Sequence, residues 1–339
     1  MPVSPTASPS RERDPAPAQP LTPDSEKKRM LIIVNPYATT VSDRLKNLVV
    51  YALQARYEVE AIDTEASEHA IEIGRDAGHG EYDVVVAFGG DGTLNEVANG
   101  LAGTGVPVSV LPGGSTNVVA RTLGIPNDVV DATEHLIGIA DDFRPRKIDL
   151  GRINGRHFVF ACGMGLDASV VKRVDAHPRT KARAGQWYFT WAAISGFYRE
   201  YLRSPVRMSV ELEGNRFEGV TAIIQNSDPF TYFGDRPVRV CDGAALDNGT
   251  LSLAVLRRSA QRDMPTIAGR VLASGKGMRP ASHRQIDHAE GVTEALVQSL
   301  SDDSEGARRR FPVQVDGDYI GDFSEVEVGV APRALTVVS

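Results

Sequence analysis

Cysteine is nearly absent from this chain, since Cys162 and Cys241 are the only two among 339 residues. Two cysteines cannot form a disulfide framework, and their spacing is not that of a zinc site, so a reducing cytoplasm is the expected compartment. Long apolar runs are also missing. The longest, such as residues 84–88, hold about five residues, whereas a helix that crosses a bilayer needs roughly 20. We therefore expect no membrane span.

An excess of positive charge is missing as well, because 37 Lys and Arg residues face 44 Asp and Glu residues. The resulting net charge of -7 opposes attraction to nucleic acid, so no nucleic-acid partner is expected. No P-loop motif occurs, and the seven histidines form no HExxH motif. The GMGLDA stretch at 163–168 lacks the acidic residue about 20 positions further on that a dinucleotide-binding fold requires.

The composition that remains is that of a folded protein with two domains. Hydrophobic residues make up 42% and charged residues 24% of the chain, as in globular proteins. At about 150 residues per domain, 339 residues predict two domains. Residues 1–28 contain seven prolines and no apolar segment of a signal peptide, which predicts a disordered tail.

Residues 29–150 alternate short apolar runs with helical stretches, which is typical of a parallel sheet with helices on both faces. The expected strands are 30–34, 59–62, 83–88 and 107–111, and the expected helices are 42–56, 68–77, 94–101 and 115–123. Residues 151–339 instead favour a β-rich, antiparallel domain with a helical insert at 167–203. Its expected strands include 156–161, 206–213, 250–256, 312–315 and 326–330. The fold class is thus α/β followed by antiparallel β.

A glycine turn, GGDGT at 89–93, follows the most apolar strand and opens a helix. Backbone N–H groups at a helix N-terminus bind phosphate, and glycine lets the backbone approach it. Asp91 is unusual there, because a carboxylate repels a phosphate unless a divalent cation lies between them or the carboxylate acts on an incoming hydroxyl. The turn therefore indicates magnesium-dependent phosphoryl transfer. The alternative is a tight turn whose aspartate caps the helix.

A second turn of the same kind, PGGSTN at 112–117, follows the next strand. Ligands of open parallel sheets bind beyond the carboxyl ends of the strands, so both turns should face one crevice. Asn35 and Pro36, which end the first strand, should lie there too. Ser115 and Thr116 could donate hydrogen bonds to phosphate oxygens, or they could simply cap a helix.

Five motifs together carry a family resemblance: Asn35-Pro36, GGDGTLNE at 89–96, PGGSTN followed by ARTLGIP at 120–126, ACGMGLDA at 161–168, and VDGD at 315–318. From about Arg29 to the C-terminus the chain resembles the soluble bacterial diacylglycerol kinase family, whose members contain a DAGK catalytic domain and are related to sphingosine and ceramide kinases. The resemblance implies transfer of the γ-phosphate of ATP to a lipid hydroxyl, with Mg²⁺.

The resemblance also implies roles for individual residues. Asp318 lies where the family usually has the glutamate assigned as the base for the lipid hydroxyl, and Asp91 is the second expected catalytic residue. The alternative for Asp318 is a plain hairpin turn at residues 316–317. The expected ATP contacts are Asn35, Pro36, Thr64, Gly89, Gly90, Asp91, Gly92, Thr93, Glu96, Gly114, Ser115, Thr116 and Asn117.

The sequence departs from the family at several positions. The first loop reads NPYATT, without the usual glycine after Asn-Pro, and the second turn lacks the Gly-Thr-Gly-Asn-Asp form. Asp247 and Asn248 lie in a stretch that resembles a structural magnesium site, but Asn248 replaces an aspartate. Their oxygens suit magnesium, and a simple hairpin turn explains them equally well.

Aromatic residues are few, and seven of the 22 lie in the stretch 186–203. Trp187, Trp191 and Tyr198 recur there at helical spacing, with Arg179, Lys181, Arg183, Arg199 and Arg203 nearby. With Asp167, these aromatics are the expected lipid-side residues, and the stretch predicts peripheral contact with a membrane surface. The alternative is a helix packed on the sheet. A homodimer is compatible with the sequence.

The expected function is a lipid kinase that converts diacylglycerol to phosphatidic acid in the cytoplasm or at its membrane surface. Two alternatives stay open. One is an NAD kinase, which also uses a GGDGT turn. The other is a nucleotide-binding regulatory protein that has lost catalysis, as the departures at Asp318 and Asn248 would allow.

Overall fold

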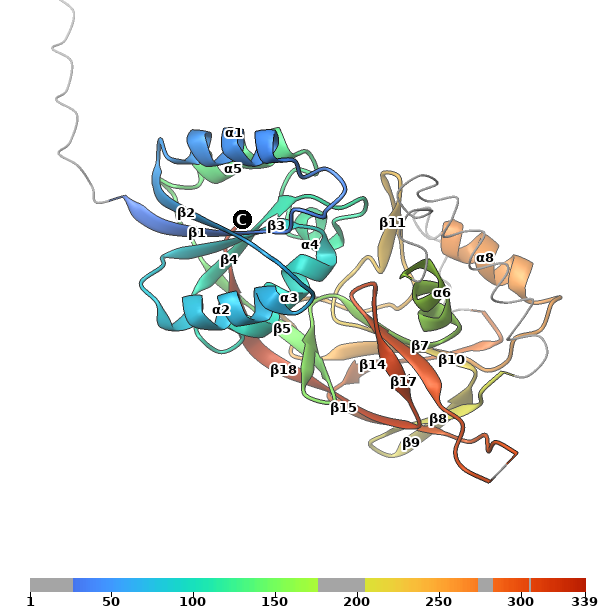
Figure 1. The fold of residues 1–339 in the computed structure, drawn as a ribbon. Coiled ribbons are helices and arrows are strands. Elements are labelled where there is room, and N and C mark those ends of the chain that lie inside the picture. Colours follow the sequence, from blue (N-terminus) through green and yellow to red (C-terminus); the bar gives the residue numbers. More distant parts are fainter. Residues whose placement is uncertain (1–26, 176–204, 274–282, 305) are drawn as a thin grey trace, which may run out of the picture.

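The computed structural model of the protein describes residues 27–175, 205–273, 283–304 and 306–339. Its first part alternates strands and helices (Figure 1). The elements are β1 (Lys28–Val34), α1 (Asp43–Leu53), β2 (Tyr57–Asp63), α2 (His69–His79), β3 (Val84–Gly89), α3 (Asp91–Leu101), β4 (Pro107–Pro112), α4 (Val118–Thr122) and α5 (Val129–Gly138). Strands β2, β1, β3 and β4 lie side by side in that order and run parallel.

Helices cover both faces of this parallel sheet. α1 and α5 lie on one face, and α2 and α3 on the other (Figure 1). Every residue of β3 is buried, as a strand covered on both faces requires. α1 begins where Ser42 accepts a hydrogen bond from the N–H of Leu45 at 3.3 Å, so the predicted N-cap is confirmed.

The second part of the chain is rich in antiparallel strands. Its elements are β5 (Arg146–Ile153), β6 (Arg156–Phe158), β7 (Ala161–Gly165), α6 (Leu166–Asp175), β8 (Met208–Leu212), β9 (Asn215–Gly219), β10 (Thr221–Gln225), β11 (Thr231–Phe233), β12 (Arg236–Val238), β13 (Leu251–Leu256), α8 (Met264–Leu272), β14 (Ile286–Val292), β15 (Glu294–Ser299), β16 (Phe311–Val315), β17 (Asp318–Phe323) and β18 (Glu325–Val337). A six-stranded sheet has the order β14-β13-β10-β7-β16-β17. Its neighbouring strands are antiparallel.

This second sheet packs against an extension of the first. The first sheet continues from β4 through β18, β15, β8 and β9. Buried side chains from both layers form the second core, including Met164 and Val313 from one sheet and Val210 and Val328 from the other. The predicted fold class, α/β followed by antiparallel β, is confirmed.

Strand β18 returns the chain to the parallel sheet. Over 13 residues it pairs antiparallel with β15 and β5 and then parallel with β4, where Thr336 lies opposite Pro107. The last strand of the chain therefore belongs to the same sheet as the first. Of this return, the sequence predicted only the strand at 326–330.

Two predicted elements need correction, and one helix was missed. The helix predicted at 115–123 is reduced to α4, because Asn117 adopts a left-handed backbone (φ 48°) and exchanges two side-chain hydrogen bonds with Gly114. The strand predicted at 156–161 is split into β6 and β7. Helix α5 was not predicted. α6 covers the start of the helical insert, and residues 176–204 lie outside the described part of the chain.

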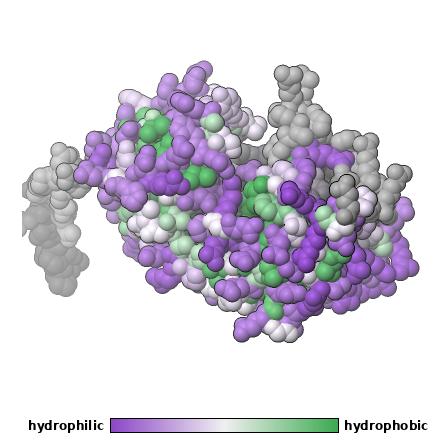
Figure 2. Space-filling model, turned by 60° about the horizontal axis from the view of Figure 1, so that its bottom comes forward, coloured by the Kyte–Doolittle hydropathy of each residue, from purple (hydrophilic) through white to green (hydrophobic). Residues whose placement is uncertain are grey.

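In the described ranges, no helix has both the length and the apolar character of a membrane span. On the face shown in Figure 2, apolar residues form small groups separated by hydrophilic ones.

One buried carboxylate ties the second part of the chain to the first. Asp316 lies in the turn between β16 and β17 and is 3% exposed. Its oxygens accept hydrogen bonds from four donors: the N–H groups of Val159 (2.6 Å), Phe160 (2.9 Å) and Ala161 (3.1 Å) and the side-chain amide of Asn95 (2.8 Å). Asn95 belongs to α3, so a single side chain holds the hairpin end, the link from β6 to β7, and α3 together.

We predict that Asp316→Ala destabilises the fold by about 3–5 kcal/mol, because it leaves several buried donors without an acceptor. The measurement is the free energy of unfolding in urea. Asp142→Ala is the control, since Asp142 is exposed and pairs only with the exposed Arg144. Equal unfolding midpoints for the two variants would contradict the role assigned to Asp316.

Candidate active site

Four loops meet at one edge of the parallel sheet. The strand register places Val34 opposite both Asp63 and Phe88, and Gly89 opposite Pro112. The residues that follow these strands therefore lie beside one another at the carboxyl ends, where open parallel sheets bind ligands. This juxtaposition brings Asn35, Thr64 and the two glycine turns together, as the sequence predicted.

The two glycine turns pack backbone against backbone. The N–H of Gly113 donates to the carbonyl of Gly89 at 2.7 Å. A Cβ atom at residue 113 would lie 2.9 Å from the Cα of Gly89, and one at residue 114 would lie 2.9 Å from the Cα of Gly90. Since real Cβ atoms do not approach so closely, only glycine allows the turns to form one continuous backbone surface.

The second turn presents two hydroxyls. Asn117 closes the turn, because its side-chain oxygen accepts the N–H of Gly114 and its amide donates to the carbonyl of Gly114, each at 2.9 Å. Ser115 is exposed and Thr116 half-buried, and their hydroxyl oxygens lie 3.5 Å apart. Both hydroxyls are therefore placed where a ligand in the crevice could accept from them.

The first loop lies against both turns. Asn35 donates from its side-chain amide to the Thr93 hydroxyl at 3.0 Å, and its side-chain oxygen accepts the N–H of Tyr37 at 3.0 Å. Thr40 donates its N–H to the carbonyl of Gly113 at 3.2 Å. The NPYATT loop thus keeps its position without the family's glycine. Pro36 is half-buried beside it.

Asp91 joins the two turns. Its oxygens accept the N–H groups of Val118 at 3.0 Å and Val119 at 3.2 Å, at the start of α4. Burial raises the pKa of Asp91 to about 6, the two backbone hydrogen bonds oppose this, and the charges of Asp316 and Asp318 raise it further. Asp91 therefore does cap a helix, as the alternative for this residue had it. The helix that it caps is α4, after the second turn, and not α3.

Asp318 reaches this crevice from the other half of the chain. It begins β17, directly after the turn at residues 316–317, whose φ angles are both positive (47° and 87°). A Cβ atom at residue 92 would overlap the carboxylate of Asp318. The hairpin therefore places this carboxylate against the first turn of α3, within the GGDGT segment. VDGD therefore forms a hairpin turn, as the alternative had it, and the same turn places Asp318 in the crevice.

The donor set fits magnesium that arrives with phosphate groups. Mg²⁺ in such sites binds one or two carboxylates, phosphate oxygens and water. Asp91 and Asp318 supply carboxylates, and each Asp91 oxygen keeps a lone pair beyond its N–H bond. Across the described ranges, no group of three or more His, Cys, Asp and Glu side chains could hold a metal ion by itself.

Two of the predicted nucleotide contacts have structural partners of their own. Glu96 accepts the N–H groups of Glu68 at 2.9 Å and Ala70 at 3.3 Å, and so caps α2. Thr64 is buried and donates its N–H to the carbonyl of Val34 at 2.8 Å. Both lie at the same edge of the sheet as the turns.

Asp167 lies away from the nucleotide turns, in the first turn of α6. Its carboxylate accepts the side-chain amide of Gln314 at 2.8 Å, and burial raises its pKa to about 6. A Cβ atom at Gly163 would overlap this carboxylate, so the glycine of the GMG stretch makes room for it. The other predicted lipid-side residues, Trp187, Trp191 and Tyr198, lie outside the described residues.

The predicted magnesium pair at 247–248 forms an exposed turn. Asn248 donates to the carbonyl of Gly243 at 3.0 Å and accepts the N–H of Thr250 at 3.0 Å, while Asp149 accepts the N–H of Gly249 at 2.6 Å. The side chain of Asn248 is therefore used within the turn. A magnesium site formed by Asp247 and Asn248 stays a prediction.

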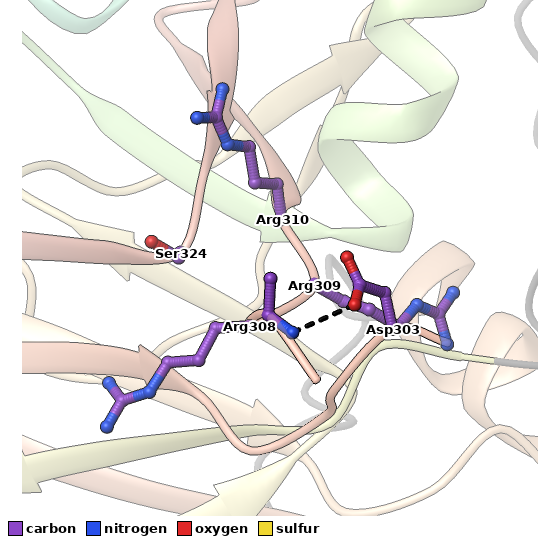
Figure 3. Close-up of a pocket in the computed structure, with 6 residues that line it drawn as sticks. Asp303, Arg308, Arg309, Arg310 and Ser324 are labelled. Carbon is purple, nitrogen blue, oxygen red and sulfur yellow. Dashed lines mark hydrogen bonds between the residues drawn. The ribbon is translucent and has the colours of Figure 1, made fainter. Parts of the chain in front are cut away.

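A surface hollow of about 620 Å³ lies apart from this crevice. Asp303, Arg308, Arg309, Arg310 and Ser324 contribute to its lining. The three arginine side chains point in different directions (Figure 3), so they do not converge on one anion. The hollow adjoins the start of β16, whereas Asp318 follows the end of that strand.

Sequence reasoning missed the residues that position the site. Asp316, Asn95 and Gln314 are buried polar side chains, and each has at least one partner that is distant in sequence. An Asp-Gly turn that needs positive φ was the one local signal for Asp316. Its four donors come from elements that only the tertiary structure brings together.

Comparisons with known proteins find relatives of both parts of the chain. A family model described as the diacylglycerol kinase catalytic domain matches residues 29–153, and one described as the YegS C-terminal NAD kinase beta sandwich-like domain matches residues 161–339. A diacylglycerol kinase of Staphylococcus aureus (strain bovine RF122 / ET3-1) is 28% identical over 301 residues, which cover 87% of each chain.

Solved structures show the same fold. A crystal structure of a diacylglycerol kinase from Bacillus anthracis str. Sterne has a TM-score of 0.64 at 18% identity and covers 93% of this chain and 98% of that one. A second structure from the same organism has a TM-score of 0.70 at 20% identity, with the same coverage.

The raised pKa of Asp167 predicts a pH-dependent stability. Because the folded pKa, about 6, lies above the unfolded value, this group's contribution is full below about pH 4 and is lost as the pH rises through 6. Asp167→Asn removes the titration and keeps an oxygen for Gln314. We expect its stability relative to wild type to rise by about 2–3 kcal/mol from pH 4 to pH 7.

The measurement is urea unfolding at several pH values between 4 and 7.5, with Asp76→Asn on the exposed face of α2 as the matched control. A stability difference for Asp167→Asn that stays constant across this range would contradict the prediction.

Proposed function

Because the chain belongs to the diacylglycerol kinase family of lipid kinases, we propose that it transfers the γ-phosphate of ATP to the hydroxyl of diacylglycerol and releases phosphatidic acid. The observation that carries the proposal is the position of Asp318. A carboxylate from the second part of the chain lies against the glycine turn of the first part, where an acceptor hydroxyl and a phosphate would have to meet.

The glycine turns are suited to the phosphates. Gly90 precedes α3 and has no side chain to cap it, so the first N–H groups of this 11-residue helix are available to phosphate oxygens. The hydroxyls of Ser115 and Thr116 add donors from the second turn. Asn35 and Thr93 are fixed to each other beside them. These groups bind and orient the nucleotide without titrating.

Magnesium, when bound with the nucleotide, would neutralise charge on the phosphates, and Asp91 and Asp318 are the residues that would hold it. Asp91 has a second task that the geometry supports. By accepting the N–H groups of Val118 and Val119, it fixes the second turn relative to the first.

Asp318 acts on the acceptor. The lipid hydroxyl oxygen attacks the γ-phosphorus, the bond from that phosphorus to the oxygen of the leaving ADP breaks, and the hydroxyl proton passes to the Asp318 carboxylate. The carboxylate needs no change of position to meet the phosphate, since it already lies against the first turn of α3.

A lipid acceptor requires contact with a membrane surface. We propose that the protein is cytoplasmic and binds the bilayer peripherally, through the aromatic and arginine-rich stretch that contains Trp187, Trp191 and Tyr198. The arginine and aromatic side chains of this stretch would then provide the membrane contact despite the net charge of -7.

One alternative acceptor has a specific observation in its favour. The second part of the chain matches a domain described as NAD kinase beta sandwich-like, and NAD kinases also phosphorylate a hydroxyl. Incubation with labelled ATP and a total lipid extract, with and without NAD, followed by identification of the labelled product, tests the proposal. Labelled phosphatidic acid supports it, and label on NAD alone would overturn it.

Asp318→Asn is predicted to lower the rate of lipid phosphorylation by about 10²–10⁴-fold, because it removes the proton acceptor. Binding of ATP in the absence of magnesium should be unchanged, since the glycine turns are intact. Turnover and nucleotide affinity are measured together, with Asp302→Asn, an exposed aspartate ahead of β16, as the control. If the Asp318→Asn variant kept its full rate, the base would have to be another group.

Gly92→Ala is predicted to separate activity from stability. The added Cβ would displace the Asp318 carboxylate, so turnover should fall by about 10- to 100-fold. Alanine is favoured over glycine within a helix, so the melting temperature should not fall. Gly138→Ala on α5 is the matched control, since its Cβ would meet no atom within 4 Å. Equal turnover for both variants would rule out the assigned contact.

A further inference from the structure

We propose that Gln314 is the positioning residue for Asp318 and that Asp167 fixes the orientation of Gln314. The inference rests on the proposed function, because it concerns how the expected base is held. It assigns a catalytic purpose to a part-buried polar pair formed by α6 and β16. The pair acts through the backbone of the hairpin turn, and neither residue touches the reacting atoms.

The side chain of Gln314 closes the turn that carries Asp318. Its oxygen accepts the N–H of Gly317 at 2.9 Å, and Gly317 directly precedes Asp318. The turn has two residues with positive φ, and Val315 pairs with Asp318 across it. Beyond this pair the register shifts, so that Gln314 faces Tyr319 while Val313 faces Gly321. A bulge of this kind changes the direction of the side chains near it. The hydrogen bond from the N–H of Gly317 to the Gln314 side chain holds the turn itself.

Asp167 determines which end of the Gln314 amide faces the turn. The carboxylate accepts from the amide nitrogen at 2.8 Å. A flipped amide would place its oxygen against the carboxylate and its NH₂ against the N–H of Gly317, and both contacts would be repulsive. Gln314 is 3% exposed, so water cannot relieve such a mismatch. The pair therefore permits one arrangement of the turn.

Helix α6 braces the same hairpin at a second point. Lys172 of α6 donates to Asp322 of β17 at 2.6 Å, and its ammonium lies 4.9 Å from the ring centre of Tyr319. α6 also packs against both β16 and β17. The helix that carries Asp167 is thus attached to the hairpin both at Gln314 and at Asp322.

The test compares Gln314→Met with Gln225→Met. Gln225 is an equally buried glutamine with both ends bonded, to the carbonyl of Ser227 and the N–H of Cys241, each at 2.8 Å. We expect Gln314→Met to lower kcat for lipid phosphorylation by about 10- to 100-fold and to leave KM for ATP unchanged. Gln225→Met should keep wild-type kcat per folded molecule. Equal kcat values for the two variants would overturn the inference.

An exchange of the two groups separates positioning from packing. Gln314→Glu alone places two carboxylates together and should lose activity. Combined with Asp167→Asn, the amide and the carboxylate trade places, and the glutamate still accepts the N–H of Gly317. The double variant should therefore recover kcat. If it stayed as slow as Gln314→Glu, Gln314 would have no positioning role.

Two further readouts distinguish this inference from the proposed function. In an Asp318→Asn background, Gln314→Met should cause no additional loss of kcat, since it acts through the missing carboxylate. Hydrogen exchange of the Gly317 amide can be measured without enzymatic activity. It should be about tenfold faster in Gln314→Met than in wild type. If the wild-type protein phosphorylates no lipid, the proposed function fails. An unchanged exchange rate of the Gly317 amide in Gln314→Met would independently overturn the positioning role of Gln314.

Discussion

The arrangement of this protein depends on the buried carboxylate of Asp316. Its four donors come from the link between β6 and β7 and from α3, so it holds together elements far apart in the chain. A carboxylate out of water is costly unless its hydrogen bonds are complete, and burial does raise the pKa of Asp316. Because the donors are complete only in this one packing, the hairpin end has a single stable position against α3. Asp318, two residues later, inherits that position.

The crevice combines rigid backbone from one half with a carboxylate from the other. The close approach of Gly89 to Gly113, and of Gly90 to Gly114, makes a backbone surface whose shape does not depend on side-chain rotamers. For the phosphate binding that we propose, a surface built from backbone needs no reorganisation when charge develops. The proposed acid–base group, Asp318, comes from the other half, so joining the two halves is what brings the two parts of the site together. The two family models match the two halves in this order along the chain, at residues 29–153 and 161–339.

Much of the fold followed from local patterns. The parallel strands were predictable because a strand buried on both faces is a continuous apolar run, and the start of α1 was predictable because Ser42 is a strong N-cap. The helix expected at 115–123 was shortened because Asn117 turns its side chain back on Gly114, a bond that competes with helix formation. The full length of β18 was not predictable, because it depends on pairing with β5 and β15, which lie elsewhere in the chain.

The sequence by itself determined the chemistry of the site: two glycine turns after buried strands, hydroxyls beside them, and an Asp-Gly-Asp hairpin, whose residue types are limited by backbone conformation and charge. Only the tertiary structure decided which groups meet. It brought Asp318 to Gly92, turned Asp91 toward the N–H groups of α4, and buried Gln314 between Asp167 and Gly317. The physical reason is the distance along the chain over which each interaction acts. Backbone preferences act within a few residues, whereas a buried polar group is satisfied only when all its distant donors and acceptors are in place.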